Sequence, residues 1–343
     1  MSSIPQITVI IPMFNAAQSI EKCLQSLMKQ TYTAFIIHLI DDGSTDETYT
    51  ICQRFAKKDE RINLFHKENS GVSLTRQFGL AQVTTPFFIF CDADDYVDSD
   101  YLRLLYNAIN QGNSDIAICS YIEEFENNSQ IIATPHFQHT FDLIDSFLQD
   151  KVWGVTWNKL YKTKIVRDYH IKFVPHLQMW EDLTFTIDYC LHTKKVTCID
   201  KPLYHYVKTN TQSITSKENI RKKIDRVKSI KHFENTMKSI GVEETFHNSL
   251  VKVKFHICRT FLNKDFTEER MNHFLTSFPE IFNDKYFIRN YSISYIMIKL
   301  GLVKYLNIEC FIKEYKNRLR SCIKNILEQF YNTSVNFYRK IKC

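Results

Sequence analysis

The first 120 residues alternate short apolar runs, rich in β-branched and aromatic residues, with amphipathic runs of helical periodicity. A bounded apolar run predicts a buried strand, and an amphipathic run predicts a helix that covers a sheet. Strands are predicted at 7–11, 35–40, 62–66, 87–91 and 116–120, and helices at 19–29, 46–57, 72–82 and 98–110. This alternation predicts an α/β fold with a mostly parallel, doubly wound sheet.

Polar segments follow four of these predicted strands. They are residues 12–15, 41–46, 69–71 and 92–95. In open α/β sheets the ligand site lies outside the carboxyl ends of the strands. We therefore expect these segments, which are far apart in the sequence, to converge with Asp182 on a single site.

The remainder of the 343-residue chain divides by pattern and by charge. Residues 123–132 resemble an exposed hairpin or loop, residues 141–150 and 181–192 helices, and residues 196–199 a strand. Long amphipathic helices are predicted at 219–240, 249–262 and 308–330. Residues 1–215 carry a net charge of −6 and residues 216–343 a net charge of +12. We predict a catalytic domain over 1–215 and a basic α-helical domain over 216–343.

Composition excludes several classes of protein. With 44% hydrophobic and 24% charged residues, and only seven Gly and seven Pro, the chain is neither disordered nor fibrous. The ten cysteines form no C-x-x-C pair and several lie in apolar runs, which is typical of reduced, buried thiols. We see neither a signal peptide nor an apolar run of the ~20 residues that span a membrane. The expected location is the cytoplasm, with peripheral contact at the inner face of the cell membrane.

The densest cluster of carboxylates is Cys91-Asp92-Ala93-Asp94-Asp95, at the end of a predicted strand. Carboxylates this close repel one another unless a cation joins them. Hard oxygen ligands favour Mg²⁺ or Mn²⁺, which bridge diphosphates. The alternative is a capping role ahead of the next helix, for which Asp98 and Ser99 already suffice.

Three further segments carry candidate site residues. Asp41 lies in D-D-G-S-T-D and could accept the imino N–H of a base, although such a segment is also ordinary turn chemistry. Arg76 follows Asn69-Ser70-Gly71 and could reach a pyrimidine or a phosphate, or could be an exposed helical arginine. Glu181 and Asp182 begin a predicted helix, where they could act as general bases or merely complement the helix dipole.

Together these segments resemble the family 2 glycosyltransferases of the GT-A fold, over roughly residues 4–215. The matching stretches are VIIPMFN (9–15), the D-D-G-S-x-D segment (40–46), N-S-G with Arg76 (69–79), the D-A-D-D form of D-x-D (91–95), and W-E-D (180–182). WNKLYKTKIV (157–166) and PLYHYVKTNTQSIT (202–215) resemble the subgroup that builds bacterial capsule, exopolysaccharide or O-antigen.

The resemblance implies a role for each matching residue. Asp182 would be the catalytic base, with Glu181 orienting the base or the acceptor. Asp94 would hold Mn²⁺ or Mg²⁺, and His205 would be a further metal ligand unless it is a core histidine. The donor would be bound by residues near the base, ribose and phosphates: Pro12, Phe14, Asn15, Asp41, Arg76, Asp92 and Ala93.

The sequence also departs from the family pattern. Phe14 replaces a common Tyr, which keeps stacking but loses a hydroxyl, and Thr75-Arg76-Gln77 replaces A-R-N. The Q-x-x-R-W pattern of processive polymerising members is missing, which favours addition of a single sugar. The resemblance thus implies an inverting, metal-dependent transfer of one sugar from a UDP-sugar to a hydroxyl of a glycan or lipid-linked glycan in bacterial surface polysaccharide synthesis.

Other functions compete with this interpretation. A non-catalytic nucleotide-sugar-binding module would result if Glu181 and Asp182 were structural. A nucleotidyltransferase would show a Gly-rich phosphate loop near its N-terminus, and a nicotinamide dehydrogenase would show G-x-G-x-x-G; this sequence has neither. The basic C-terminal helices could contact anionic lipid, or could simply pack or form an oligomer contact. We expect no nucleic-acid partner, because their charges are interleaved with acids.

Overall fold

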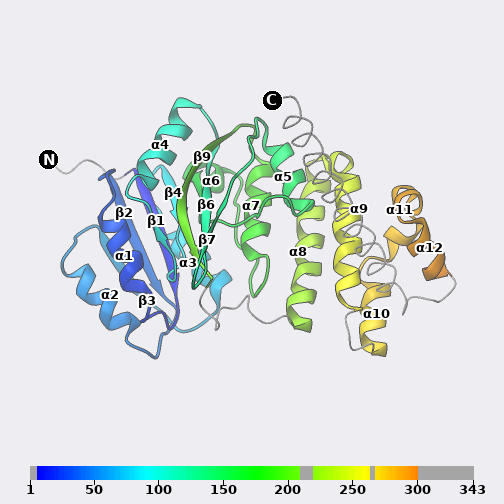
Figure 1. Cartoon of the computed structure of the whole chain (residues 1–343), viewed down its shortest axis with the longest axis horizontal. Coiled ribbons are helices and arrows are strands. Elements are labelled where there is room, and N and C mark those ends of the chain that lie inside the picture. Colours follow the sequence, from blue (N-terminus) through cyan, green and yellow to red (C-terminus); the bar gives the residue numbers. More distant parts are fainter. Residues whose placement is uncertain (1–5, 209–218, 263–266, 300–343) are drawn as a thin grey trace, which may run out of the picture. The chain divides into compact units, whose positions relative to one another are not determined.

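The computed structural model describes residues 6–208, 219–262 and 267–299 (Figure 1). The chain divides into two compact units, Met1–Val253 and Lys254–Cys343. The first unit contains the sheet and the helices that cover it. The division at residue 215 that charge and pattern suggest stays a prediction about domains, and the helix predicted at 308–330 lies outside the described residues.

Nine strands of the described residues form one sheet, in the order β3-β2-β1-β4-β8-β6-β9-β5 with β7 pairing to β6. Their bounds are β1 Ile7–Met13, β2 Phe35–Asp41, β3 Ile62–His66, β4 Phe87–Phe90, β5 Tyr96–Val97, β6 Ile116–Glu124, β7 Ser129–Ile132, β8 Lys159–Lys162 and β9 Val196–Val207. The first four strands in this order are parallel, and Ile7 pairs with both Phe35 and Phe87. The rest of the sheet is mixed, because β8 runs antiparallel to β4 and β6.

The helices of the first unit lie between and after these strands in the sequence. They are α1 Ile20–Met28, α2 Thr48–Ala56, α3 Val72–Ala81, α4 Tyr101–Gln111, α5 Thr140–Leu148, α6 Thr163–Asp168, α7 Glu181–Leu191 and α8 Ile220–Ser239. Helix α9, Glu243–Thr260, crosses the boundary between the units. The second unit also contains α10 Glu268–Thr276, the 3₁₀ helix Pro279–Asn283, α11 Lys285–Asn290 and α12 Ser292–Lys299. Among the described residues, no helix combines the length and apolar character that a membrane crossing needs.

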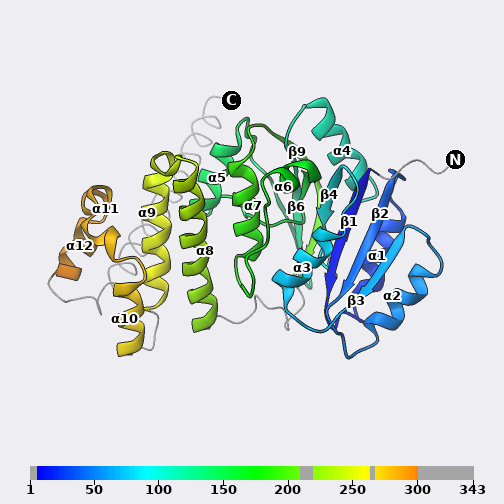
Figure 2. The same cartoon turned by 180° about the vertical axis from the view of Figure 1, so that it is seen from behind.

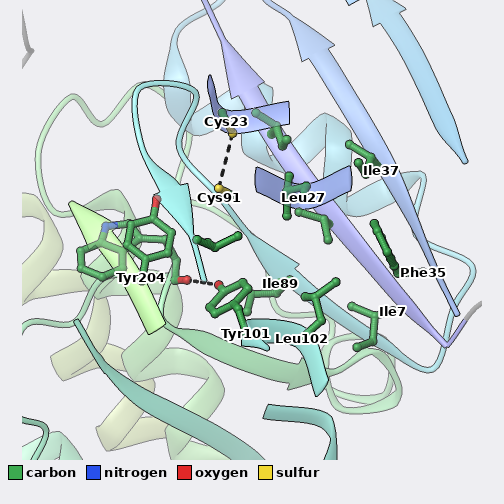
Figure 3. Close-up of a cluster of buried hydrophobic side chains, with 14 of the residues drawn as sticks. Ile7, Cys23, Leu27, Phe35, Ile37, Ile89, Cys91, Tyr101, Leu102 and Tyr204 are labelled. Atoms are coloured by element: carbon green, nitrogen blue, oxygen red, sulfur yellow. Dashed lines mark hydrogen bonds between the residues drawn. The ribbon is translucent and has the colours of Figure 1, made fainter. Parts of the chain in front are cut away.

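The main core lies between the sheet and helices α1, α2 and α4. Alternate residues of the parallel strands, such as Ile7 and Ile37, meet Leu27 of α1 and Leu102 of α4 (Figure 3). Alternation puts one side chain in two on each face of a strand, so the other face must be covered as well. Helix α3 packs on β1 and β2 on that second face, which Figure 2 shows from behind.

Helix α3 approaches the sheet very closely at Gly79. A Cβ atom at this position would lie 2.5 Å from Cγ2 of Ile10 and 3.1 Å from Cγ1 of Ile40. Both distances are below ordinary van der Waals contact, so only glycine fits without a shift of its neighbours. Farther along the same face, Phe173 and Phe185 stack with ring centroids 4.3 Å apart and pack against Phe90.

The α/β fold class and the strand–helix alternation predicted for residues 1–120 are confirmed. Helices α7 and α8 lie where the sequence predicts them, and β9 extends the predicted strand 196–199 to Val207. The region 123–132 is a hairpin, in which β6 pairs with β7. The sequence interpretation missed the short strands β5 and β8 and the helix α6.

Candidate functional site

The loops that follow β1 and β2 are tied together by hydrogen bonds. Asn15 has a left-handed backbone, with φ 50°, and its amide N–H donates to Oγ of Ser44 at 2.9 Å. Its side-chain oxygen accepts from the amide N–H of Thr45 at 2.9 Å. Asn tolerates this backbone conformation better than most residues, so the loop turns back toward β2 at little cost. Asn15 and the 41–46 segment, which the sequence predicts as site residues, thus lie side by side in the fold.

Two neighbouring carboxylates end β2, and each has its own partner. Asp41 is fully buried, and its Oδ2 lies 2.6 Å from Nδ1 of the half-exposed His66. Asp42 accepts from the amide N–H groups of Ser70 and Gly71, both at 2.9 Å, and from Nζ of Lys67.

The environment of Asp42 favours its charged form. Burial alone would raise the pKa of this carboxyl, but the hydrogen bonds from Lys67, Ser70 and Gly71 outweigh burial and hold its pKa below the ordinary value. Gly71 has φ 87°, which allows its amide to point at the carboxylate where α3 begins. The loop after β3 is thereby fixed to the loop after β2.

Arg76 joins two of the predicted motifs directly. It projects from α3 and is 5% exposed. One terminal nitrogen donates to Oδ1 of Asp92 at 2.9 Å, and the other donates to Oε1 of Glu181 at 2.5 Å. Burial alone would lower the pKa of the guanidinium, but the charges of Asp92, Glu181 and Asp182 outweigh burial and raise it. Arg76 is therefore a buried cation between the D-A-D-D and W-E-D segments.

Asp182 lies in the first turn of α7, immediately after Glu181. Burial and the neighbouring Glu181 charge raise the pKa of Asp182 to about 7, against the opposing effect of Arg76. Its Oδ1 accepts from the amide N–H of Leu183 at 2.7 Å. Trp180, just before the helix, is left-handed with φ 67°, an unfavourable conformation for a bulky residue. The helix start thus combines backbone strain with a carboxylate that is hard to ionise.

The three aspartates of the D-A-D-D segment have different surroundings. Asp95 is 1% exposed; its carboxylate accepts from the hydroxyl of Tyr204 at 2.6 Å and from the amide N–H of Val207 at 2.8 Å. Burial, and then the charges of Asp92 and Asp94, raise the pKa of Asp95 well above its ordinary value. Asp95 therefore has a structural role, and it shows that Asp92 and Asp94 are close enough to act on it electrostatically.

His205 lies on β9 beside Tyr96, its partner in the antiparallel β5–β9 pair. The two rings stack with centroids 4.2 Å apart. Nδ1 of His205 is 2.7 Å from Oε1 of Glu124, and Nε2 is 3.4 Å from Oδ1 of Asp98. The imidazole thus has two carboxylate neighbours in the protein, and its role as a metal ligand stays a prediction.

The other predicted donor residues lie at the ends of the same parallel strands. Pro12 is in β1 and pairs with Ile40 of β2. Phe14 follows β1 and is 50% exposed, so its ring is accessible for stacking. Ala93 is buried at the end of β4, between Asp92 and Asp94.

The donor atoms of the D-A-D-D segment suit a hard divalent cation. Asp92 and Asp94 supply carboxylate oxygens, and Asp95 is engaged with Tyr204 and Val207. In the described parts of the chain, no three His, Cys, Asp or Glu residues are grouped so that they could hold a metal. Mg²⁺ and related ions are commonly held by one or two carboxylates together with substrate phosphates, so two aspartates fit such an ion when a diphosphate completes its shell.

The sequence interpretation missed several partners that hold this site together. Lys67 and His66 are the partners of Asp42 and Asp41, and Tyr204 is the partner of Asp95. His66 ends β3 and Lys67 follows it at the same end of the sheet, so the strand-end pattern contained a signal for them. Tyr204 is 109 residues from Asp95 in sequence, and no local pattern connects the two.

Comparisons with known proteins agree with this geometry. Residues 8–171 match the model of the family described as "Glycosyl transferase family 2". Glycosyltransferase GlyA of Streptococcus pneumoniae is 30% identical over 213 residues, covering 59% of this chain and 30% of GlyA. EpsH of Bacillus subtilis is 30% identical over 209 residues, covering 59% of this chain and 60% of EpsH. The chain therefore spans less than two thirds of the length of these relatives.

One curated relative aligns over nearly the whole chain, and one solved structure shares the fold. Cholesterol galactosyltransferase of Borreliella burgdorferi is 25% identical over 358 aligned positions, covering 97% of this chain and 94% of that protein. The crystal structure of residues 1–349 of TarS from S. aureus with UDP-GlcNAc superposes with a TM-score of 0.67 and 21% identity, and covers 81% of both chains. This likeness agrees with the fold class that the sequence predicts.

Proposed function

Residues 8–171 are a glycosyl transferase family 2 domain, and on that premise we propose that the protein transfers one sugar from a UDP-sugar to a hydroxyl of a glycan or lipid-linked glycan. The observation that carries the proposal is the ion-pair network in which Arg76 joins Asp92 to Glu181. Asp92 suits a complex of the donor with a cation, and Glu181 and Asp182 suit an acceptor hydroxyl. The side chain of Arg76 alone separates Asp92 from Glu181.

The donor end of the site uses residues at the ends of β1, β2 and β4. Asp41 accepts the imino N–H of uracil, and Phe14 stacks on the base beside Pro12 and Asn15. Asp92 and Ala93 contact the ribose and diphosphate side of the donor. The TarS structure that shares this fold is a complex with UDP-GlcNAc, which supports a UDP-sugar donor here.

Arg76 serves the donor by fixing Asp92. Both terminal nitrogens of its guanidinium are engaged with carboxylates, and the side chain is buried. Asp94, next to Asp92, would hold Mg²⁺ or Mn²⁺ together with the diphosphate of the donor. Such an ion supplies charge neutralisation for the departing diphosphate.

Asp182 removes the proton from the acceptor hydroxyl as its oxygen attacks the anomeric carbon. Attack from the side opposite the leaving diphosphate inverts the configuration at that carbon, and no covalent sugar–enzyme intermediate is required. A pKa of about 7 suits a general base at neutral pH, because enough of the group is ionised and it still holds a proton well. Glu181, held by Arg76, orients the acceptor or the base.

Acceptor and location are proposed from the relatives and from charge. The relatives include a poly(ribitol-phosphate) beta-N-acetylglucosaminyltransferase of Staphylococcus aureus, which supports a role in bacterial surface polysaccharide synthesis. The basic C-terminal half favours peripheral contact with anionic lipid at the inner face of the cell membrane. Lys228 and Lys238 of α8 are at least half exposed, and each is paired with acidic residues, whereas Lys222 and Lys223 are buried. Salt-sensitive binding to anionic liposomes would support this contact, and binding no greater than to neutral liposomes would refute it.

The test of the proposed function is a donor screen. The chain is incubated with Mn²⁺ or Mg²⁺, a mixture of glycan acceptors and each of UDP-glucose, UDP-galactose, UDP-GlcNAc and UDP-GalNAc, and release of UDP by transfer to a glycan or to water is measured. We expect release from at least one donor. UDP binding without release from any donor would indicate a binding module. Pyrophosphate release from UTP and a sugar 1-phosphate would indicate a nucleotidyltransferase instead.

A further inference from the structure

A cluster of partly exposed aromatic rings surrounds one ammonium group beside the candidate active site. We define it as the aromatic platform, made of Phe125, Trp153, Tyr206 and Lys208. Nζ of Lys208 lies 5.4, 5.2 and 5.7 Å from the ring centroids of Phe125, Trp153 and Tyr206. Phe125 and Trp153 are each 40% exposed, although large aromatic side chains are usually more buried.

The sheet places three members of the platform at one end of the β6–β9 pair. Glu123 of β6 and Tyr206 of β9 are register partners, Phe125 directly follows β6, and Lys208 directly follows β9. The amide N–H of Lys208 donates to the carbonyl of Glu124 at 2.8 Å, which extends the pairing beyond the strands. The platform is therefore attached to rigid strands.

Trp153 comes from the segment between α5 and β8, which is also held firmly. The ring of Trp153 is edge-on to Tyr206, with centroids 6.1 Å apart. The fully buried Lys159 donates from Nζ to the carbonyls of Trp153 at 3.2 Å and Val155 at 2.7 Å. A buried ammonium that satisfies two loop carbonyls fixes the backbone that presents the indole.

The same segment contacts the start of the helix that carries Asp182. A Cβ atom on Gly154 would lie 3.2 Å from Cα of Leu183, so the two backbones touch at this point. Trp153 and Asp182 are each one residue from that contact. With 3.8 Å per Cα step, their Cα atoms are at most about 12 Å apart.

We propose that the aromatic platform binds a pyranose ring of the acceptor glycan, next to the sugar whose hydroxyl reacts. The inference rests on the proposed function for the identity of the acceptor. Flat ring faces cover the C–H face of a pyranose, which is apolar, while its hydroxyls need hydrogen-bond partners at the rim. Lys208 supplies N–H donors at this rim, and the buried carboxylate of Glu123, 2.7 Å from its Nζ, holds the ammonium in place.

This chemistry favours a sugar over a sterol. A sterol is apolar on nearly all sides, and the partly exposed ammonium of Lys208 would lose hydration against it without gaining a partner. A sugar accepts hydrogen bonds from this ammonium through its hydroxyl oxygens. The span from the platform to Asp182 also suits an acceptor of two or three sugar units.

The test measures glycan binding separately from catalysis. Full-length protein is applied to an array of bacterial-type di- and trisaccharides without any UDP-sugar, and to phosphatidylcholine vesicles with and without cholesterol. The variants are Trp153→Ala, Trp153→Phe, and Tyr169→Ala as a matched control, because Tyr169 is an aromatic that is 52% exposed elsewhere in the unit. Circular dichroism and thermal melting check that each variant is folded.

We expect the wild type to bind at least one glycan, with affinity about tenfold weaker in Trp153→Ala and within about threefold of wild type in Trp153→Phe and Tyr169→Ala. UDP binding should be equal in all four proteins. Absence of glycan binding by the wild type, equal binding by Trp153→Ala, or binding to cholesterol vesicles alone would overturn the proposal. Failure of the proposed function would appear differently, as glycan binding that Trp153→Ala weakens in a protein that releases no UDP from any donor.

Discussion

The two halves of the sheet shift the pKa values of nearby carboxylates in opposite directions. At the end of the parallel half, Asp42 accepts two backbone N–H groups and a lysine, and its pKa lies below the ordinary value. Next to the mixed half, burial and the charge of Glu181 raise the pKa of Asp182 to about 7. The comparison teaches that one site can hold a permanently charged carboxylate, which organises loops, and a second carboxylate whose proton is available for chemistry.

The largest effect is expected at Asp182. Replacing it by Asn removes the proton acceptor, so turnover should fall by about 10²- to 10⁴-fold. UDP binding, measured by calorimetry, should stay within a few-fold of wild type because the donor residues are untouched. Asp168→Asn, at the exposed end of α6, is the matched control. Unchanged turnover in Asp182→Asn would remove the base from the proposed mechanism.

The second prediction concerns the cation on the donor side. Asp94→Ala should weaken the binding of UDP in the presence of Mn²⁺ by about 10- to 100-fold, because a ligand of the ion is lost. Binding of UDP without added metal should change far less. Asp100→Ala, which removes a surface carboxylate paired with Arg103, serves as the control in the same calorimetric titration. Equal Mn²⁺-dependent affinity in Asp94→Ala and wild type would place the ion elsewhere.

The third prediction concerns Asp42, which joins the loop after β2 to the loop after β3. Asp42→Asn replaces an acceptor by an amide that cannot serve all three donors, so the free energy of unfolding should fall by about 1–3 kcal/mol in urea titrations at pH 7. Because the pKa of Asp42 is lowered on folding, its contribution is present above the ordinary value of 3.8 and is lost as the pH falls below it.

The difference between Asp42→Asn and wild type should therefore shrink in acid. Asp59→Asn, which removes a partly exposed ion pair with Arg61, should cost less at pH 7. If Asp42→Asn lowered the free energy of unfolding no more than Asp59→Asn does, the hydrogen bonds at Ser70 and Gly71 would have no organising role.

The smallest effect is the pH dependence of the wild type. With Asp182 as the base, kcat/KM should decline below pH 7 and be about tenfold lower at pH 6 than on the alkaline plateau. The free energy of unfolding changes with pH in the opposite direction. Because folding raises the pKa of Asp182, the folded state holds an extra proton between about pH 4 and pH 7, and the free energy of unfolding falls as the pH rises through that range. Asp182→Asn should lack this slope, and retention of the slope would assign the titration to another group.

The parallel half of the fold was predictable because its sequence obeys local rules. Ile7–Met13 and Phe35–Asp41 are apolar runs, and their polar continuations lie at the carboxyl ends of the strands, where an open sheet puts its ligand site. The prediction that the loops bearing Asn15, Asp41, Arg76 and Asp94 meet at these ends follows from that rule. The contacts of Asn15 with Ser44 and Thr45, and of Asp42 with Ser70 and Gly71, show how the loops are joined.

The mixed half was harder because long-range contacts override local pattern there. Strand β8 begins with Lys159, a residue type that normally marks the surface, yet here the lysine is fully buried and satisfied by loop carbonyls. β5 is only two residues long and exists through its pairing with Tyr204 and His205. The link from Arg76 to Glu181 spans 105 residues, and no periodicity or motif spacing encodes it.

Gly79 connects packing to electrostatics at this site. It lies three residues after Arg76 on α3, where the helix touches Ile10 and Ile40 without room for a methyl group. A methyl group at this position would lie 2.5 Å from Cγ2 of Ile10, so α3 or the side chain of Ile10 would have to move, and a movement of α3 would carry the guanidinium with it. The position of the Arg76 guanidinium, which binds Asp92 and Glu181, thus depends on the absence of a side chain at Gly79. A mutational scan confined to polar residues would overlook this glycine.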